Sequence, residues 1–302
     1  MSNKQAGAAR PALAYVMLTF VALTWASATV ILRGVHEQIP PLQLTCWRWS
    51  IGALFLLALG WSDIKAHRAI ISINVRQYFV VGCFTTVGSS ITATALHFTT
   101  AINGGLVNAA QPAVTAMLAW LLLREKLSVR QVAGILLAVI GIVAMISRLN
   151  WTVITSFQFN AGDVLMLVAV VSYGLYATNV RKLPKQLGLN ATLFCLFAAG
   201  SLALIPFAIA EAIYFDRVTF SWQIAAAVVY LALIPSVLAM WLWNTAIHQV
   251  GVNRSAVFLN LIPVFGAAMA IAFLGESLQA YHLIGALLVG AGIALVVRAQ
   301  RA

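Results

Sequence analysis

The chain has 302 residues, of which 62% are hydrophobic and only 8% are charged, and its mean hydropathy is +0.96. Soluble domains carry about 25% charged residues, so this composition excludes a protein whose surface faces water throughout. The formal net charge is +11, but the basic residues lie between apolar runs and form no basic helical face that would bind nucleic acid. We therefore expect an integral membrane protein embedded in the lipid bilayer that does not bind nucleic acid.

Ten apolar segments follow one another, and each has the length of a membrane-spanning helix. In chain order they cover residues 12–32, 42–61, 78–98, 104–123, 129–147, 162–180, 190–211, 222–246, 253–274 and 280–297. The first is longer than a signal-peptide core and is read as a retained helix. The sequence thus predicts an all-α integral membrane protein with ten transmembrane helices.

The basic residues predict the orientation of these helices. Fourteen of the 18 Lys and Arg residues fall on the side of the N-terminus, and Arg33, Arg148 and Arg217 fall on the other side. Arg48 lies inside the second segment. Because cytoplasmic loops are enriched in Lys and Arg, both termini are expected in the cytoplasm.

The second half of the chain repeats the first with a shift of 151 residues. Between residues 112 and 142, 11 of 31 positions are identical after this shift. The shift superposes Pro112, Glu125, Gly134 and Gly141 on Pro263, Glu276, Gly285 and Gly292. Residues 1–150 and 151–302 would then each hold five helices, and because five is odd the second repeat is inverted. Inverted repeats are typical of alternating-access transporters with a site at the midplane.

Polar side chains concentrate on the first, third, fourth, sixth, eighth and ninth segments. Asn108, Gln111 and Thr115 are spaced to share one helical face. Polar groups that face lipid are costly, so such faces point at a cavity or form hydrogen bonds between helices. The residues predicted to line a substrate cavity are Trp25, Thr94, His97, Asn108, Gln111, Tyr173, Tyr176, Asn179, Trp241, Asn244 and Asn260. For the aromatic residues among them, packing is the alternative.

Pro112 and Pro263 occupy matched positions in the fourth and ninth segments. Each proline removes one backbone hydrogen bond, which would free the carbonyl groups of Asn108 and Leu259. The pair predicts two hinges, with packing kinks as the alternative. The matched glycines of the fifth and tenth segments predict close packing of these two helices.

Three charged residues allow two interpretations each. Glu125 and Glu276 are either gating carboxylates or stabilise the N-terminus of the following helix through its dipole. Arg48 either extends its guanidinium to the outer membrane interface or pairs with an unidentified group.

Several kinds of site are absent from the sequence. All seven acidic residues lie at or near segment ends, and the three cysteines lie in apolar runs as buried thiols. There is no Walker loop, metal-ligand cluster or nucleophile with a base. This argues against an ATP-driven pump, a membrane enzyme and a carrier of anionic phosphates, and no cofactor or metal is expected.

Two stretches carry a family resemblance. The pattern Pro-Leu-x-Leu-x-x-x-Arg runs from Pro41 to Arg48, and the third to fifth segments contain LHFTTAINGGLVNAAQPAVTAMLAWLLLREKLSVRQVAGILLAVIGI. With the repeat, these closely resemble the drug/metabolite transporter superfamily of EamA type, and most of all its bacterial aromatic amino-acid exporters. Ala26 departs from the family, because many members have Gly after the Trp of the first helix.

The resemblance implies an exporter of the bacterial inner membrane with a central cavity. We expect a monomer that exports small neutral metabolites, amino acids including aromatic ones, by alternating access and facilitated diffusion. The alternatives are export of other hydrophobic metabolites or drugs by proton antiport, and a membrane assembly or sensor subunit that transports nothing.

Overall fold

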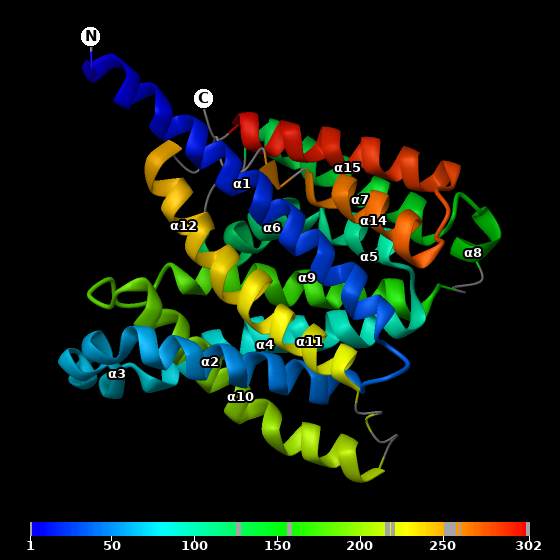
Figure 1. Cartoon of the computed structure of the whole chain (residues 1–302). Coiled ribbons are helices and arrows are strands. Elements are labelled where there is room, and N and C mark those ends of the chain that lie inside the picture. Colours follow the sequence, from blue (N-terminus) through cyan, green and yellow to red (C-terminus); the bar gives the residue numbers. More distant parts are fainter. Residues whose placement is uncertain are drawn as a thin grey trace.

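Backbone groups in lipid need internal hydrogen bonds, so the long apolar runs of this chain form helices. The computed structural model describes residues 2–124, 128–155, 159–214, 218, 221–250, 258–259 and 261–299, and these contain no strand (Figure 1). The first half holds α1 (Ser2–Gly34), α2 (Pro41–Ala66), α3 (Arg68–Ile73), α4 (Val75–Phe98), α5 (Ala101–Asn108), α6 (Gln111–Leu123) and α7 (Val129–Ile146). The second half holds α8 (Trp151–Thr155), α9 (Ala161–Val180), α10 (Leu189–Tyr214), α11 (Trp222–Leu231), the π-helix η1 (Ala232–Leu238), α12 (Ala239–Val250), α14 (Leu261–Leu274) and α15 (Ala280–Ala299).

Within the described residues, eight helices are long and apolar enough to cross a membrane. They are Ala12–Gly34, Pro41–Ala66, Val75–Phe98, Ala101–Leu122, Val129–Ile146, Ala161–Val180, Leu189–Tyr214 and Trp222–Ile247, and they coincide with the first eight predicted segments. Two shorter apolar helices, Leu261–Leu274 and Ala280–Leu295, cover described parts of the last two segments. Large apolar side chains such as those of Leu54 and Phe207 are exposed around the bundle, as contact with lipid requires.

Two of the predicted segments are interrupted. The fourth is divided by a turn at Ala109 and Ala110 into α5 and α6, and Pro112 is the second residue of α6. A proline at this position loses no helical hydrogen bond, because the first N–H groups of a helix have no partner within it. The eighth segment is divided into α11, η1 and α12 by Pro235.

Helices far apart in the sequence pack side by side. α2 packs on α10, α4 on α9, α7 on α15, and α1 on both α12 and α14 (Figure 1). At the α7–α15 contact, a Cβ added to Gly141 would lie 2.9 Å from the carbonyl oxygen of Gly285. A Cβ added to Gly292 would lie 2.8 Å from the amide nitrogen of Ala138. The predicted close packing of the fifth and tenth segments through glycine is confirmed.

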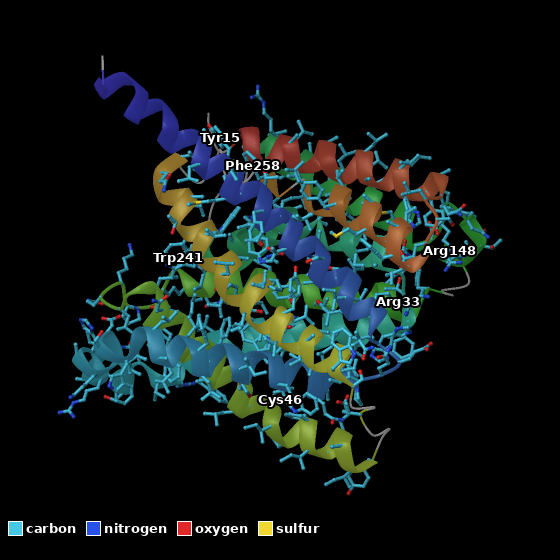
Figure 2. All side chains as sticks on the ribbon, viewed as in Figure 1. Tyr15, Arg33, Cys46, Arg148, Trp241 and Phe258 are labelled. Carbon is cyan, nitrogen blue, oxygen red and sulfur yellow. The ribbon has the colours of Figure 1, made fainter. Side chains whose placement is uncertain are left out.

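The bundle has two ends of different content. The N-terminus and α3 lie at one end, here called the α3 end (Figure 1). The other end, here called the α8 end, carries α8, Arg33 and Arg148 (Figures 1 and 2). Arg33 donates from Nη1 to the carbonyl of Leu96 at 2.6 Å, which satisfies one of the last acceptors of α4.

α2 and α10 stabilise each other's N-termini. Glu211, near the end of α10, accepts hydrogen bonds from the amides of Leu42 and Gln43 at 3.2 and 2.8 Å, at the start of α2. Asp63, near the end of α2, accepts from the amide of Gly188 at 2.7 Å, immediately before α10. Both carboxylates satisfy N–H groups that a helix leaves without an internal partner.

Glu276 also stabilises a helix N-terminus, but not the predicted one. Its two carboxylate oxygens accept from the amides of Ala101 and Ile102 at 2.7 and 2.9 Å, at the start of α5. Glu276 therefore stabilises the start of a helix, but this helix is α5, and the expectation that it would be the following helix, α15, is wrong. Glu125, its repeat counterpart, lies outside the described residues.

Candidate functional site

Pro235 converts the middle of the eighth apolar segment into a π-helix. Because proline has no N–H, the carbonyl of Leu231 lacks its usual helical donor, and the hydroxyl of Ser236 donates to it at 2.8 Å. The amide of Ala239 bonds to the carbonyl of Ile234 in the wider π pattern. The carbonyl of Pro235 and the oxygen of Ser236 are thereby available to neighbouring helices. π-helices of this kind are frequent at functional sites.

Arg48 on α2 uses the oxygen of Ser236. Its Nε donates to Ser236 Oγ at 3.1 Å, and its guanidinium carbon lies 5.7 Å from the centroid of the Trp49 ring. Of the two interpretations of Arg48, the structure supports a partner inside the bundle.

Aromatic side chains from α1 and α12 lie beside the same turn. The indole N–H of Trp25 donates to the carbonyl of Pro235 at 2.9 Å, and the Trp25 and Trp243 rings lie 5.5 Å apart. The hydroxyls of Ser27 and Tyr230 share a hydrogen bond of 2.7 Å. These contacts define the η1 cluster, which consists of Trp25, Ser27, Arg48, Tyr230, Ser236 and Trp243. It joins α1, α2, α11, η1 and α12.

Two further predicted residues, Tyr173 and Tyr176, lie on α9. The ring carbons of Tyr173 lie 3.1 Å from where a Cβ on Gly88 would stand. Tyr176, one turn further along α9, packs against the apolar core that includes Trp49. Of the predicted residues, Trp25 is the one that lies in the η1 cluster.

Three predicted residues on α9 and α12 are arranged differently. The side-chain amides of Asn179 and Asn244 donate to carbonyls of their own helices, those of Leu175 and Met240, at 2.8 and 2.7 Å. Trp241 lies on the outer side of α12 with 47% of its surface exposed (Figure 2).

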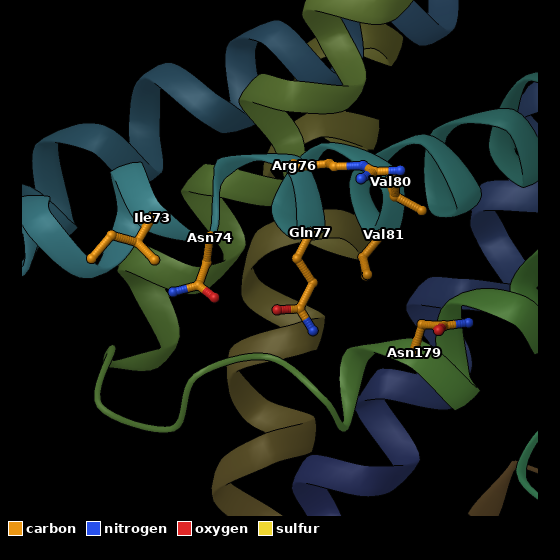
Figure 3. Close-up of a pocket in the computed structure, with 7 residues that line it drawn as sticks. All are labelled: Ile73, Asn74, Arg76, Gln77, Val80, Val81 and Asn179. Carbon is orange, nitrogen blue, oxygen red and sulfur yellow. The ribbon is translucent and has the colours of Figure 1, made fainter.

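A pocket of about 340 Å³ opens at the α3 end, between α3, α4 and α9 (Figure 3). Its lining consists of Ile73, Asn74, Arg76, Gln77, Val80, Val81 and Asn179. Gln77 from α4 and Asn179 from α9 lie on two sides of it (Figure 3). Asn179 is the one predicted residue in this lining.

The other predicted residues lie along α4, α5 and α6. The hydroxyl of Thr94 donates to its own helix, and the His97 ring meets the His36 ring edge-on at 5.3 Å. Asn108 ends α5, and its Oδ1 is buried without a hydrogen-bond partner among the described residues. Gln111 begins α6. Asn260 lies outside the described residues.

The predicted hinge at Pro263 needs one correction. The carbonyl of Leu259 is not free, because the amide of Ile262 donates to it at 3.1 Å in a tighter turn. Pro263 is the third residue of α14, and Pro112 is the second of α6. Both prolines therefore stand at helix starts, where their missing N–H groups are least costly.

Sequence reasoning missed a buried polar network at the α8 end. Asp163, 1% exposed, accepts from the hydroxyl of Thr99 and lies 3.3 Å from the amide nitrogen of Asn103. The oxygen of that amide bonds to Nε2 of His282 at 2.7 Å. Because Gln279 donates its amide N–H to His282 Nδ1, Nε2 carries the proton. The network ties α4 and α5 to α9 and α15.

Within the described part of the chain, no three His, Cys, Asp or Glu side chains gather to hold a metal ion.

The η1 cluster also contains residues that were not predicted. Ser236 and Tyr230 stand outside the predicted cavity lining, and Pro235 interrupts an apolar run and is followed by Ser. A proline followed by a hydroxyl residue inside a membrane segment is a usable signal, because the freed carbonyl needs a new donor.

Comparison with known proteins identifies the family. The sequence model of the EamA-like transporter family matches residues 12–147 and 160–298. This chain belongs to the EamA-like transporter family. As an EamA-like transporter, it is a multi-pass membrane protein.

Relatives of this EamA-like transporter cover nearly its whole length. It is 24% identical over 281 residues to an uncharacterized transporter of Bacillus subtilis, covering 92% of each chain. It is 25% identical over 290 residues to a probable amino-acid metabolite efflux pump of Escherichia coli, again covering 92% of each. A solved crystal structure superposes with a TM-score of 0.59 at 20% identity, covering 95% of this chain and 98% of that chain, which shows likeness of fold alone.

Proposed function

We propose that this EamA-like transporter exports small amino acids of zero net charge, aromatic ones included, from the cytoplasm. The observation that carries the proposal is the η1 cluster, which places indole rings, hydroxyl groups and one guanidinium on adjoining membrane helices. Such a set suits a ligand with a charged end and an aromatic side chain. The similarity to a probable amino-acid metabolite efflux pump supports this substrate class.

The proposed mechanism is alternating access between two inverted repeats of five spans, residues 1–150 and 151–302. Three observations support it. The family model matches the chain twice. Arg124 and Gly275, 151 residues apart, both have left-handed φ angles, 54° and 66°. Asp63 on α2 stabilises the start of α10, and Glu211 on α10 stabilises the start of α2, an exchange that supports a two-fold relation between the repeats. The site would then lie at the repeat interface.

The proposed setting is the bacterial inner membrane, with both termini in the cytoplasm and the protein acting as a monomer. The excess of Lys and Arg on the side of the N-terminus supports this orientation. In it the α3 end, with its pocket, faces the cytoplasm and the α8 end faces outward.

For the energetics we propose facilitated diffusion, since Asp63, Glu211 and Glu276 are engaged with helix N-termini. Proton antiport is the second candidate, because Asp163 and His282 are buried titratable groups in one network.

The test is efflux of labelled tryptophan and phenylalanine from proteoliposomes holding the purified protein. Flux down the amino-acid gradient without a pH gradient is expected. Flux that begins only when a proton gradient is imposed would replace facilitated diffusion by antiport. No flux under either condition, with a folded protein, would contradict an amino-acid exporter.

A further inference from the structure

Arg48 has more hydrogen-bond donors than the structure occupies. A guanidinium carries five N–H donors in a rigid fork. In the described residues its one hydrogen bond is from Nε to Ser236, and no carboxylate lies within ion-pair distance. The Nη1 and Nη2 edge, which matches a carboxylate in a bidentate pair, has no hydrogen-bond acceptor in this part of the chain.

The position of Arg48 within a membrane helix makes its unpaired N–H donors costly. Arg48 is the eighth residue of the 26-residue helix α2 and is held toward η1 and the Trp49 ring. A charged side chain within a membrane is costly unless a partner or water compensates it. Leucine would span the bilayer at no such cost, so the guanidinium needs a reason beyond packing.

We propose that Arg48 binds the carboxylate of the transported amino acid. This rests on the proposed function and deepens it. The unoccupied guanidinium edge receives the two carboxylate oxygens, and the ligand supplies the counter-charge that the described residues lack. Export of the amino acid would then require its carboxylate, and analogues without one would be discriminated against.

The π-helix positions the guanidinium for this role. The Ser236 hydroxyl donates to Leu231, so its oxygen is oriented to accept from Arg48 Nε. The carbonyl of the preceding residue, Pro235, accepts a hydrogen bond from the indole N–H of Trp25. Adjacent residues of η1 therefore fix a carboxylate receptor and an aromatic surface beside each other. Ser236 acts as a positioning residue that does not touch the ligand.

The experiment compares L-tryptophan with L-tryptophan amide in proteoliposomes holding wild type, Arg48→Gln, Arg48→Lys or Ser236→Ala. Wild type is expected to prefer the acid. Arg48→Gln should reduce that preference by about tenfold or more, through a higher KM for the acid and little change for the amide. Arg48→Lys should retain part of it, because an ammonium is a point charge without the fork. Ser236→Ala should lower the preference less than Arg48→Gln.

Arg68→Gln on the exposed helix α3 is the matched control and should keep the wild-type preference. A merely structural Arg48 would lower flux of acid and amide alike, so an unchanged ratio in Arg48→Gln overturns the proposal. If Arg48→Gln does not fold, Arg48→Lys decides: a reduced ratio supports the proposal and a wild-type ratio overturns it.

Failure of the proposed function is separable from failure of this inference. If wild type moves no tryptophan, thermal stabilisation by indole-3-acetate is compared with that by indole-3-acetamide. Stabilisation by the carboxylate alone, lost in Arg48→Gln and retained in Arg68→Gln, supports an anion site at Arg48. Equal effects of the two probes on wild type overturn it.

Discussion

At the scale of single residues, carboxylates stabilise helix starts in this molecule. Glu276 bonds to two amides at the start of α5, and Glu211 does the same for α2. Hydrogen bonds to a charged acceptor are about twice as strong as neutral ones. These acids therefore contribute to holding helices of different sequence regions together.

Glu276→Ala is expected to lower the free energy of unfolding by about 1–3 kcal/mol, because the amides of Ala101 and Ile102 lose their acceptor. The measurement is thermal unfolding of the purified protein in detergent. Glu37→Ala is the control, since the Glu37 side chain is 85% exposed. Equal transition temperatures for the two variants would contradict the assigned role.

At the scale of elements, one proline determines the geometry of η1. With an N–H restored at position 235, the carbonyl of Leu231 would regain its helical donor and the Ser236 hydroxyl would be released. The wider π turn is thus a consequence of this proline. The turn places the Pro235 carbonyl against α1 and the Ser236 hydroxyl against α2.

Pro235→Ala is therefore expected to keep or raise stability while reducing transport several-fold. The measurements are thermal unfolding and tryptophan flux in proteoliposomes. Pro206→Ala is the matched control, because Pro206 lies inside α10 with its side chain exposed. Unimpaired flux in Pro235→Ala would show that the π geometry is dispensable.

The α7–α15 contact gives a second test at this scale. Gly→Ala stabilises an unstrained helix by about 1 kcal/mol. Gly290→Ala should show this gain, since no atom lies within 4 Å of the added Cβ. Gly141→Ala should instead destabilise by about 1–3 kcal/mol, because its Cβ would lie 2.9 Å from the backbone oxygen of Gly285. Unfolding temperatures that shift in the same direction would refute close backbone contact.

At the scale of the whole molecule, side-chain hydrogen bonds at the α8 end link the first half of the chain to the second. Asn103 from α5 is linked to Asp163 on α9 and to His282 on α15. At the opposite end a pocket lies between α3, α4 and α9, with Asn179 in its lining (Figure 3).

The orientation itself is testable with reporter fusions. A reporter after Ala302 is expected in the cytoplasm, and one inserted between Arg148 and Gly162 is expected outside. A C-terminal reporter that is active only on the outer side would reverse the topology, and with it the direction in which the pocket opens.

The apolar pattern along the chain was sufficient to locate the helices. Long apolar runs leave the backbone no alternative to helical hydrogen bonds in lipid, so segment positions follow from composition alone. The glycine pattern of the fifth and tenth segments likewise predicted their contact, because only residues without a side chain allow backbones to meet.

Which polar groups meet inside the bundle depends on how distant helices pack together. Ser236 lies 188 residues from Arg48, and Pro235 lies 210 residues from Trp25, so no local pattern could pair them. For the same reason Glu276 was assigned to the wrong helix, since its partners lie 174 and 175 residues away. Hydropathy identifies which residues enter the membrane, but the side-chain partners inside the bundle depend on packing between helices that the one-dimensional pattern does not contain.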